Sequence, residues 1–115
     1  MKTLQEIVDK GQRIVFFGGA GVSTESGIPD FRSADGLYNQ KYAYPPEVIL
    51  SDRFFYSKPE EFFKFSREKM IFPNAKPNAA HRKLFELEQA GKLRGVVTQN
   101  IDGLHRMAGN RLVYE

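Results

Sequence analysis

A glycine-rich segment directly after an apolar run is the first place in this sequence where chemistry could occur. The run IVFFG at 14–18 is followed by GAGVST at 19–24. Glycines let the backbone approach a pyrophosphate, whose charge is then met by N–H groups of a following helical turn. Thr24 stands where a dinucleotide fingerprint has its third glycine, and no Gly-Lys-Ser/Thr follows, so neither an ordinary dehydrogenase nor a P-loop is predicted. A tight strand-to-helix turn without a ligand remains the alternative.

The second half of the same segment brings an acid, an aromatic ring and a guanidinium together after a rigid proline. These residues are Pro29, Asp30, Phe31 and Arg32. Arg32 could pair with a phosphate or with Asp30, and Phe31 could cover a flat ligand or anchor the loop in a core. The residue types alone leave both interpretations open.

Asn100 and Asp102 form a second candidate pair, because they follow another strand-like segment. Asp102 could bind ribose hydroxyls or a carboxamide N–H, and an Asn-x-Asp-Gly turn with its own hydrogen bonds is the alternative. His81 and His105 have the titration range of catalytic groups. Each lies within a predicted helix, so we interpret both as structural.

The elements that position these residues begin with a helix and a strand. Thr3 and Glu6 match a capping box, which predicts a helix to about Gly11. The continuously apolar segment 14–17 predicts a strand buried on both faces. The segment 18–40 then reads as a long loop with one helical turn at 22–26, and a loop of that length suggests function.

The rest of the chain alternates helices with short strands. Pro45 and Pro46 open a helical turn, and Ser57 with Glu60 forms a second predicted capping box of a helix that stops before Pro73. Asn78 is the predicted N-cap of a helix over 79–90. The remaining predicted elements are a strand at 95–98, a helix at 104–108 and a strand at 112–114.

Strands separated by helices predict an α/β fold, a Rossmann-like doubly wound parallel sheet. Ligands of such sheets bind beyond the carboxyl ends of the strands. The segments 18–38 and 99–103 both follow strands, so we expect them to meet at one end of the sheet.

The amino-acid composition further limits the kinds of protein that this sequence can be. The chain has 115 residues, 17 Lys+Arg, 14 Asp+Glu and no cysteine. The basic residues are scattered, which does not match a nucleic-acid-binding stripe, and a thiolate zinc site cannot form within these residues. No segment has the apolar character of a signal peptide or a membrane span. We expect a cytoplasmic protein that contacts neither nucleic acid nor membrane directly.

Two long motifs in the same order resemble the sirtuins, the Sir2-like NAD-dependent protein lysine deacylases, in their bacterial form. These are GAGVSTESGIPDFRS at 19–33 with Gly36-Leu37-Tyr38, and TQNID at 98–102 with Gly103-Leu104-His105. The segments FFYSKPEEF at 54–62 and PNAAHRKL at 77–84 are also similar to that family. The resemblance covers the whole chain.

The resemblance implies a cofactor, NAD, and a site. The implied cofactor-binding residues are Gly19, Ala20, Gly21, Ser23, Thr24, Phe31, Arg32, Tyr38, Gln99, Asn100, Ile101 and Asp102. It implies catalytic roles for Asn100, Asp102 and Arg32, with Asp102 binding the carboxamide of nicotinamide. The acyl group of an acyl-lysine protein or peptide would pass to ADP-ribose, with release of nicotinamide, and the segment 30–45 would act as a lid.

The chain departs from the family pattern after Val113-Tyr114-Glu115, where sirtuins continue to a His-Gly pair that supplies the general base. His105 does not match that base. The family's zinc module of two cysteine pairs is also not within the sequence. We therefore expect residues 1–115 to be the N-terminal part of an incomplete NAD-binding domain, with a cofactor loop at 30–45 and a helical insertion at 45–75. A zinc site is expected only outside residues 1–115.

This expectation has consequences for activity and association. The chain alone is expected to be inactive and, with an exposed sheet edge, prone to self-association. A non-catalytic NAD- or ADP-ribose-binding module, or a truncated sirtuin remnant, is the alternative. Sirtuins that prefer acidic acyl groups carry Tyr-x-x-Arg where Phe63 and Ser66 stand here, which favours an uncharged acyl group such as acetyl.

Overall fold

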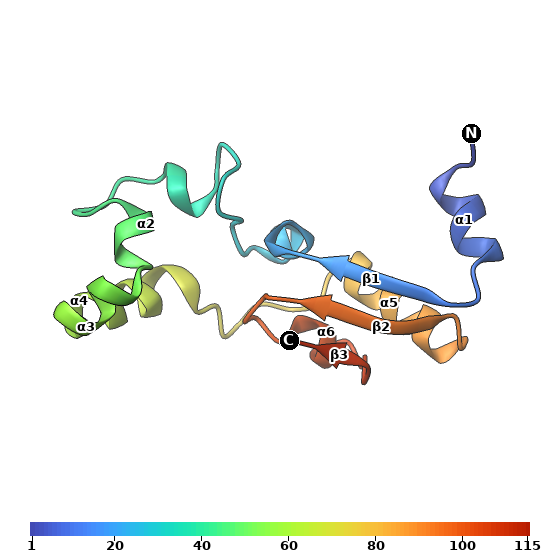
Figure 1. Cartoon of the computed structure of the whole chain (residues 1–115). Helices are drawn as coiled ribbons and strands as arrows, with labels where there is room; N and C mark the ends of the chain where they lie inside the picture. The colour runs from blue at the N-terminus through green and yellow to red at the C-terminus, as the bar shows by residue number, and fades with distance from the viewer.

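The protein is an elongated molecule with a sheet at one end and a group of short helices at the other (Figure 1). A computed structural model describes residues 1–115, and its principal extents are 50 × 30 × 25 Å. Two separate apolar cores, one in each part, explain the elongated shape.

Three parallel strands form the sheet. They are β1 (Ile14–Gly18), β2 (Leu93–Thr98) and β3 (Val113–Tyr114), in the spatial order β1-β2-β3. Phe16 of β1 pairs with Val96 of β2, and Val96 pairs with Val113 of β3. All pairings are parallel and helices lie between the strands in sequence, which confirms the predicted Rossmann-like fold.

The helices that cover the sheet lie on one of its faces. These helices are α5 (Ala79–Gln89), which contacts β2, and α6 (Leu104–Met107), which contacts α5 (Figure 1). Leu84 of α5 packs with Leu93 and Val96 of β2 and with Val113 of β3. Ile14 and Phe16 of β1 complete this core.

The prediction that β1 is buried on both faces is wrong. Exposure alternates along the strand, and Val15 and Phe17 are 60% and 81% exposed. Successive side chains of a strand point to opposite faces, so the residues opposite the α5 face have nothing packed on them. A continuously apolar run therefore does not by itself show that both faces of a strand are covered.

Side-chain caps begin both the helix that precedes β1 and helix α5. In α1 (Leu4–Lys10), Thr3 and Glu6 form the predicted capping box. In α5, the Asn78 side chain accepts from the Ala80 N–H, as predicted, and its amide also donates to the Val22 carbonyl at 2.8 Å. Asn78 therefore both begins α5 and ties it to the loop after β1.

A second group of helices follows, which we call the helical module (residues 37–72). It contains a 3₁₀ turn at Leu37–Asn39, then α2 (Pro46–Ile49), α3 (Asp52–Ser57), α4 (Pro59–Phe65) and one π-helical turn at Ser66–Met70. Leu37, Ile49, Phe54 and Phe65 form its buried core. Tyrosines and Phe62 pack around that core, so most of the aromatic side chains here are structural.

The second predicted capping box is wrong. Lys58 occupies the N-cap position of α4 and makes no side-chain cap. Ser57 is instead the last residue of α3, and its hydroxyl donates to the Arg53 carbonyl at 2.8 Å. Two short helices meet here, and Ser51 caps the first of them.

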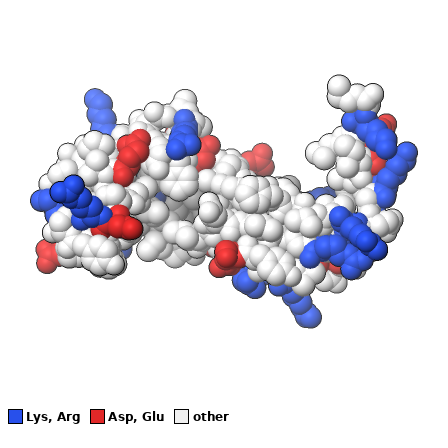
Figure 2. Space-filling view, viewed as in Figure 1, with Lys and Arg blue, Asp and Glu red and all other residues white.

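Charged side chains of both signs are interspersed over the helical module on the face shown in Figure 2. On the same face, basic side chains gather at the end of the molecule that carries α1 (Figure 2), although the basic residues are scattered in the sequence. None of the helices combines the length and apolar character needed to span a membrane.

Candidate functional site

The loops after β1 and β2 meet at the carboxyl ends of the strands, as the sequence predicted. The Ser23 hydroxyl donates to Asp102 Oδ2 at 2.6 Å, and Asn100 Nδ2 donates to the Gly19 carbonyl at 2.9 Å. Ser23 is buried and lies in the 3₁₀ helix Ala20–Ser26. Ser23 and Asp102 are 79 positions apart in the sequence and share this partly buried hydrogen bond. A hydrogen bond from a hydroxyl to a carboxylate is stronger than one between two neutral groups.

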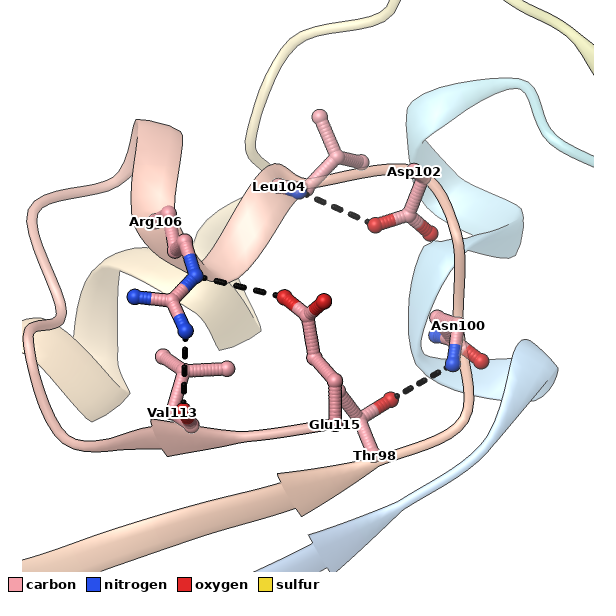
Figure 3. Close-up of polar contacts among 7 residues, drawn as sticks. All are labelled: Thr98, Asn100, Asp102, Leu104, Arg106, Val113 and Glu115. Atoms are coloured by element: carbon pink, nitrogen blue, oxygen red, sulfur yellow. Dashed lines mark hydrogen bonds and ion pairs between the residues drawn. The ribbon is translucent and has the colours of Figure 1, made fainter.

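The turn after β2 is organised by its own polar groups (Figure 3). The Asn100 N–H donates to Thr98 Oγ1 at 3.0 Å, and the Leu104 N–H donates to Asp102 Oδ1 at 2.9 Å. Gly103 has φ of +69°, a left-handed conformation that favours glycine. The turn that was an alternative to ligand binding is therefore present, and it fixes the Asp102 carboxylate at the cavity wall.

A cavity of about 210 Å³ lies between these loops and the helical module. Its lining is mainly apolar, with Asn100, Asp102 and Lys69 among the polar exceptions. The lining residues are Ala20, Ser23, Ile28, Pro29, Phe31, Leu37, Lys69, Met70, Phe72, Gln99, Asn100, Ile101 and Asp102. An apolar pocket with a few convergent polar groups is typical of a small-molecule site.

The structure brings together seven of the twelve residues named as cofactor-binding candidates. Those in the cavity wall are Ala20, Ser23, Phe31, Gln99, Asn100, Ile101 and Asp102. The other five, Gly19, Gly21, Thr24, Arg32 and Tyr38, lie outside it. Thr24 Oγ1 donates to the Gly21 carbonyl at 3.0 Å, and the Arg32 guanidinium lies 5.8 Å from the Tyr38 ring centre.

The loop that carries Phe31 folds back on itself. The Leu37 N–H donates to the Asp30 carbonyl at 2.6 Å, and the Tyr38 N–H donates to the Phe31 carbonyl at 2.7 Å. A Cβ on Gly36 would come within 2.8 Å of the Phe31 carbonyl oxygen, so the close approach requires glycine there. The Phe31 ring packs on the Tyr38 ring, with ring centres 5.4 Å apart, and also lines the cavity, so a role in covering a ligand stays a prediction.

Sequence reasoning did not place Lys69, Met70 and Phe72 at the site. These residues belong to the helical module and reach the cavity only because the module folds over the ends of the strands. Met70 and Lys69 lie on the π-helical turn, a geometry often found at functional sites. The sequence held no signal for that turn.

His81 and His105 pack against each other beneath the site rather than in the cavity. Their ring centres lie 4.9 Å apart, and the side chains are 0% and 2% exposed. His81 Nδ1 accepts from the Asn78 N–H at 3.1 Å. Burial lowers the pKa of both histidines below the ordinary 6.5, and the neighbouring His105 lowers that of His81 further, against a raising effect of Asp102. The burial of both side chains agrees with the interpretation of His81 and His105 as structural residues.

The backbone of the loop after β1 borders open space at two of its glycines. A Cβ built on Gly19 or on Gly21 would meet no heavy atom within 4 Å, so the backbone there borders open space. That open backbone lies next to the cavity wall, since Ala20 lines the cavity.

The parallel sheet, the glycine-rich turn and a cavity beyond the strand ends define a Rossmann-like α/β protein. The chain belongs to the Sir2 family, whose family model matches residues 19–115. A curated relative from Clostridium acetobutylicum, described as an NAD-dependent protein deacetylase, is 62% identical over 114 residues. That alignment covers 97% of this chain and 46% of the relative, so the chain spans about half the length of the curated relatives it matches.

The solved structures that are similar to this chain are also Sir2 proteins. A mutant Sir2 homologue in complex with ADP-ribose superposes with a TM-score of 0.85 and 42% identity, covering 98% of this chain and 45% of that one. A Sir2 protein bound to an acetylated peptide gives a TM-score of 0.76 and 40% identity, with 98% and 44% covered. The fold of residues 1–115 is therefore that of the corresponding part of Sir2 proteins.

Proposed function

We propose that residues 1–115 supply the nicotinamide side of the NAD site in an NAD-dependent protein lysine deacetylase. Such an enzyme transfers the acyl group of an acyl-lysine to ADP-ribose and releases nicotinamide. The observation that carries the proposal is the Ser23–Asp102 hydrogen bond, which fixes a carboxylate at the wall of an apolar cavity beyond the strand ends. The names of the Sir2 relatives support it.

Asp102 is suited to bind a carboxamide. Each of its oxygens accepts one hydrogen bond, from Ser23 and from Leu104, and a carboxylate can accept about four. The remaining capacity can accept an N–H of nicotinamide. Asn100 lines the same cavity and keeps the loops together through Gly19.

NAD supplies a ribose carbon that becomes electrophilic when its bond to nicotinamide breaks. The side chains of Ile28, Phe31 and Phe72 line part of the cavity wall, and an apolar wall of this kind limits the water around a bound ring. Fixed polar groups in a water-excluded site stabilise developing charge without reorganising. The proposed role of these residues is to orient the ring and to shield the reacting end of the site, with Asn100 and Asp102 as polar groups of the cavity wall.

The candidates outside the cavity have a different proposed role. Gly19, Gly21 and Thr24 border the open backbone of the loop and are suited to the phosphates of NAD. Arg32 is exposed beside Tyr38 and makes no ion pair, so its guanidinium is free to meet a phosphate. These roles extend the site from the cavity towards the rest of the nucleotide.

Further parts of the proposal rest on the sequence. An uncharged acyl group such as acetyl is favoured by Phe63 and Ser66, and the partner is an acyl-lysine protein or peptide. Neither of the two histidines precedes a glycine, so we propose no turnover by residues 1–115 alone. The cytoplasmic location, the domain role of the 30–45 and 45–75 segments and a zinc module outside this chain stay predictions.

A non-catalytic module that binds NAD or ADP-ribose is the second candidate. It is favoured by the buried, structural setting of both histidines, which leaves the cavity without a histidine in its wall. The two candidates differ in whether the site supports nicotinamide release once it is joined to a complete Sir2 sequence.

The test is a chimera in which residues 1–115 replace the matching half of the Clostridium acetobutylicum relative. Nicotinamide release is measured with NAD and an acetyl-lysine peptide, for the chimera and for the chain alone. We expect release by the chimera only. Asn100→Ala should lower the rate roughly a hundredfold, as removal of a fixed polar group at a reacting centre does.

Asn74→Ala is the matched control, because Asn74 is an exposed asparagine that does not line the cavity. It should leave the rate within twofold. A folded chimera that binds NAD but releases no nicotinamide would favour the binding module. Release by the chain alone, lost in Asn100→Ala, would contradict the claim that residues 1–115 need the second half.

A further inference from the structure

The short 3₁₀ helix Ala20–Ser26 decides where the Ser23 hydroxyl lies, and therefore whether it reaches Asp102. No side chain caps the start of this helix at Gly19. The hydrogen bonds of a 3₁₀ helix have poorer geometry than those of an α-helix. Contacts from other parts of the chain are therefore needed to fix its position.

One buried side chain outside the cavity wall makes two such contacts. Asn78 Nδ2 donates to the Val22 carbonyl at 2.8 Å and to the Ser26 hydroxyl at 3.0 Å. An amide nitrogen carries two N–H donors, so both are used on the same helix. Asn78 is 8% exposed and does not line the cavity. Val22 directly precedes Ser23, so Asn78 holds the backbone next to the residue that meets Asp102.

Asn78 is itself held by α5. Its Oδ1 accepts from the Ala80 N–H at 2.9 Å, and its backbone N–H donates to His81 Nδ1 at 3.1 Å. Helix α5 in turn packs on the sheet through Leu84, which belongs to the same core as Val96 of β2. Asn78 therefore connects a helix anchored on the sheet to the helix that carries Ser23.

We propose that Asn78 is a positioning residue of the NAD site, acting through the helix 20–26 to keep Ser23 on Asp102. The inference rests on the proposed function, because that function assigns the site to NAD. The two roles of Asn78 lie on different atoms. The cap of α5 uses Oδ1, whereas the contacts to Val22 and Ser26 use Nδ2. Hydrogen bonds weaken steeply when their geometry is disturbed, so a small shift of the helix is enough to weaken the Ser23–Asp102 bond.

Asn78→Ser separates the two roles. A serine hydroxyl caps a helix as well as an asparagine does, but it lacks the amide donors. The first measurement compares nitrogen–proton correlation spectra of the full chain without ligand. We expect Asn78→Ser to move the amide signals of residues 99–104, which Asn78 does not touch, because Asp102 loses its bond to Ser23.

Ser51→Ala is the matched control. Ser51 also caps a helix, and its hydroxyl also donates to a backbone carbonyl, that of Val48 at 2.6 Å, but both contacts are local to the helical module. It should leave the signals of residues 99–104 in place. If Asn78→Ser does not fold, Ser26→Ala replaces it, since this change removes one contact of Asn78 and leaves the cap of α5 intact. It should move the same signals by a smaller amount.

The second measurement is a double-mutant cycle on NAD binding by the full chain. The net contribution of a typical hydrogen bond corresponds to a change of about three- to tenfold in a binding constant, so we expect Asn78→Ser to weaken NAD binding roughly fivefold. In a Ser23→Ala chain the same substitution should change the binding constant less than about twofold, because the contact through which Asn78 acts is already lost.

Two results would overturn the proposal and leave the proposed function intact. The first is a folded Asn78→Ser chain, or a folded Ser26→Ala chain in its place, whose signals at residues 99–104 do not move. The second is additive effects of Asn78→Ser and Ser23→Ala on NAD binding. An unmodified chain that binds no NAD would instead contradict the proposed function, and the spectra without ligand then decide the role of Asn78.

Discussion

Replacing Ser23 by alanine should destabilise the protein before any ligand is added. Ser23 is 1% exposed, and its hydroxyl donates to Asp102 Oδ2 at 2.6 Å. A hydrogen bond to a charged group contributes about 1.5–3 kcal/mol, and here its loss leaves a carboxylate oxygen without a donor. We expect Ser23→Ala to lower the free energy of unfolding by about 2 kcal/mol.

Urea unfolding followed by circular dichroism measures this change. With a slope of about 1–2 kcal/mol/M for a chain of this size, the midpoint should fall by about 1–2 M. Ser33→Ala is the matched control, because the Ser33 hydroxyl also donates to a carboxylate, that of Asp30, but at an exposed position. It should change the free energy of unfolding by less than about 0.5 kcal/mol.

The two variants together isolate the effect of burial. Equal losses in Ser23→Ala and Ser33→Ala would refute the reasoning, since they would show that the Ser23 bond gains nothing from its buried setting. A Ser23→Ala protein as stable as the parent would refute the claim that this bond joins the two loops.

Three further predictions concern pH, capping and association. The lowered pKa of His81 and His105 means that the unfolded state binds more protons below about pH 6.5, so the free energy of unfolding should fall as pH drops below that value. Urea midpoints that stay constant from pH 7 to pH 5 would argue against neutral buried histidines. Asn78→Ala removes an N-cap and the contacts to Val22 and Ser26, and should cost about 1–2 kcal/mol in urea unfolding, more than Ser51→Ala, whose cap is local. Phe17→Ser should weaken self-association in sedimentation velocity, because Phe17 is the most exposed side chain of the open sheet face, whereas Tyr56→Ser on the helical module should not. A parent chain that sediments as a monomer at every concentration would contradict the association prediction.

The sequence was sufficient for the three strands and for α1, α2, α5 and α6, whereas α3 and the π-helical turn were not predicted. Thr3, Glu6 and Asn78 cap helices because their side chains satisfy N–H groups two or three residues away, and such local bonds can be read from spacing. Ser57 and Glu60 have the same spacing but no cap, because α3 continues through Ser57. Local patterns are reliable only where no neighbouring helix competes for the residue.

The candidate site could be predicted on its strand side and not on its module side. Ser23 and Asp102 meet because parallel strands end at one edge, which follows from topology. Lys69 and Phe72 reach the cavity through the packing of the helical module, and no periodicity in the sequence encodes that contact. The open face at Val15 and Phe17 was missed because an apolar run does not show how many faces the chain covers.

The central claim is that NAD binds where the loops after β1 and β2 meet, and amide chemical shifts test it most directly. The measurement is a nitrogen–proton correlation spectrum of the chain, recorded during titration with NAD. The account predicts that the largest shift changes fall at residues 19–24, 31–38 and 99–103, and that Asn100→Ala reduces them. Changes centred on α3 and α4, or no change at saturating NAD, would contradict it.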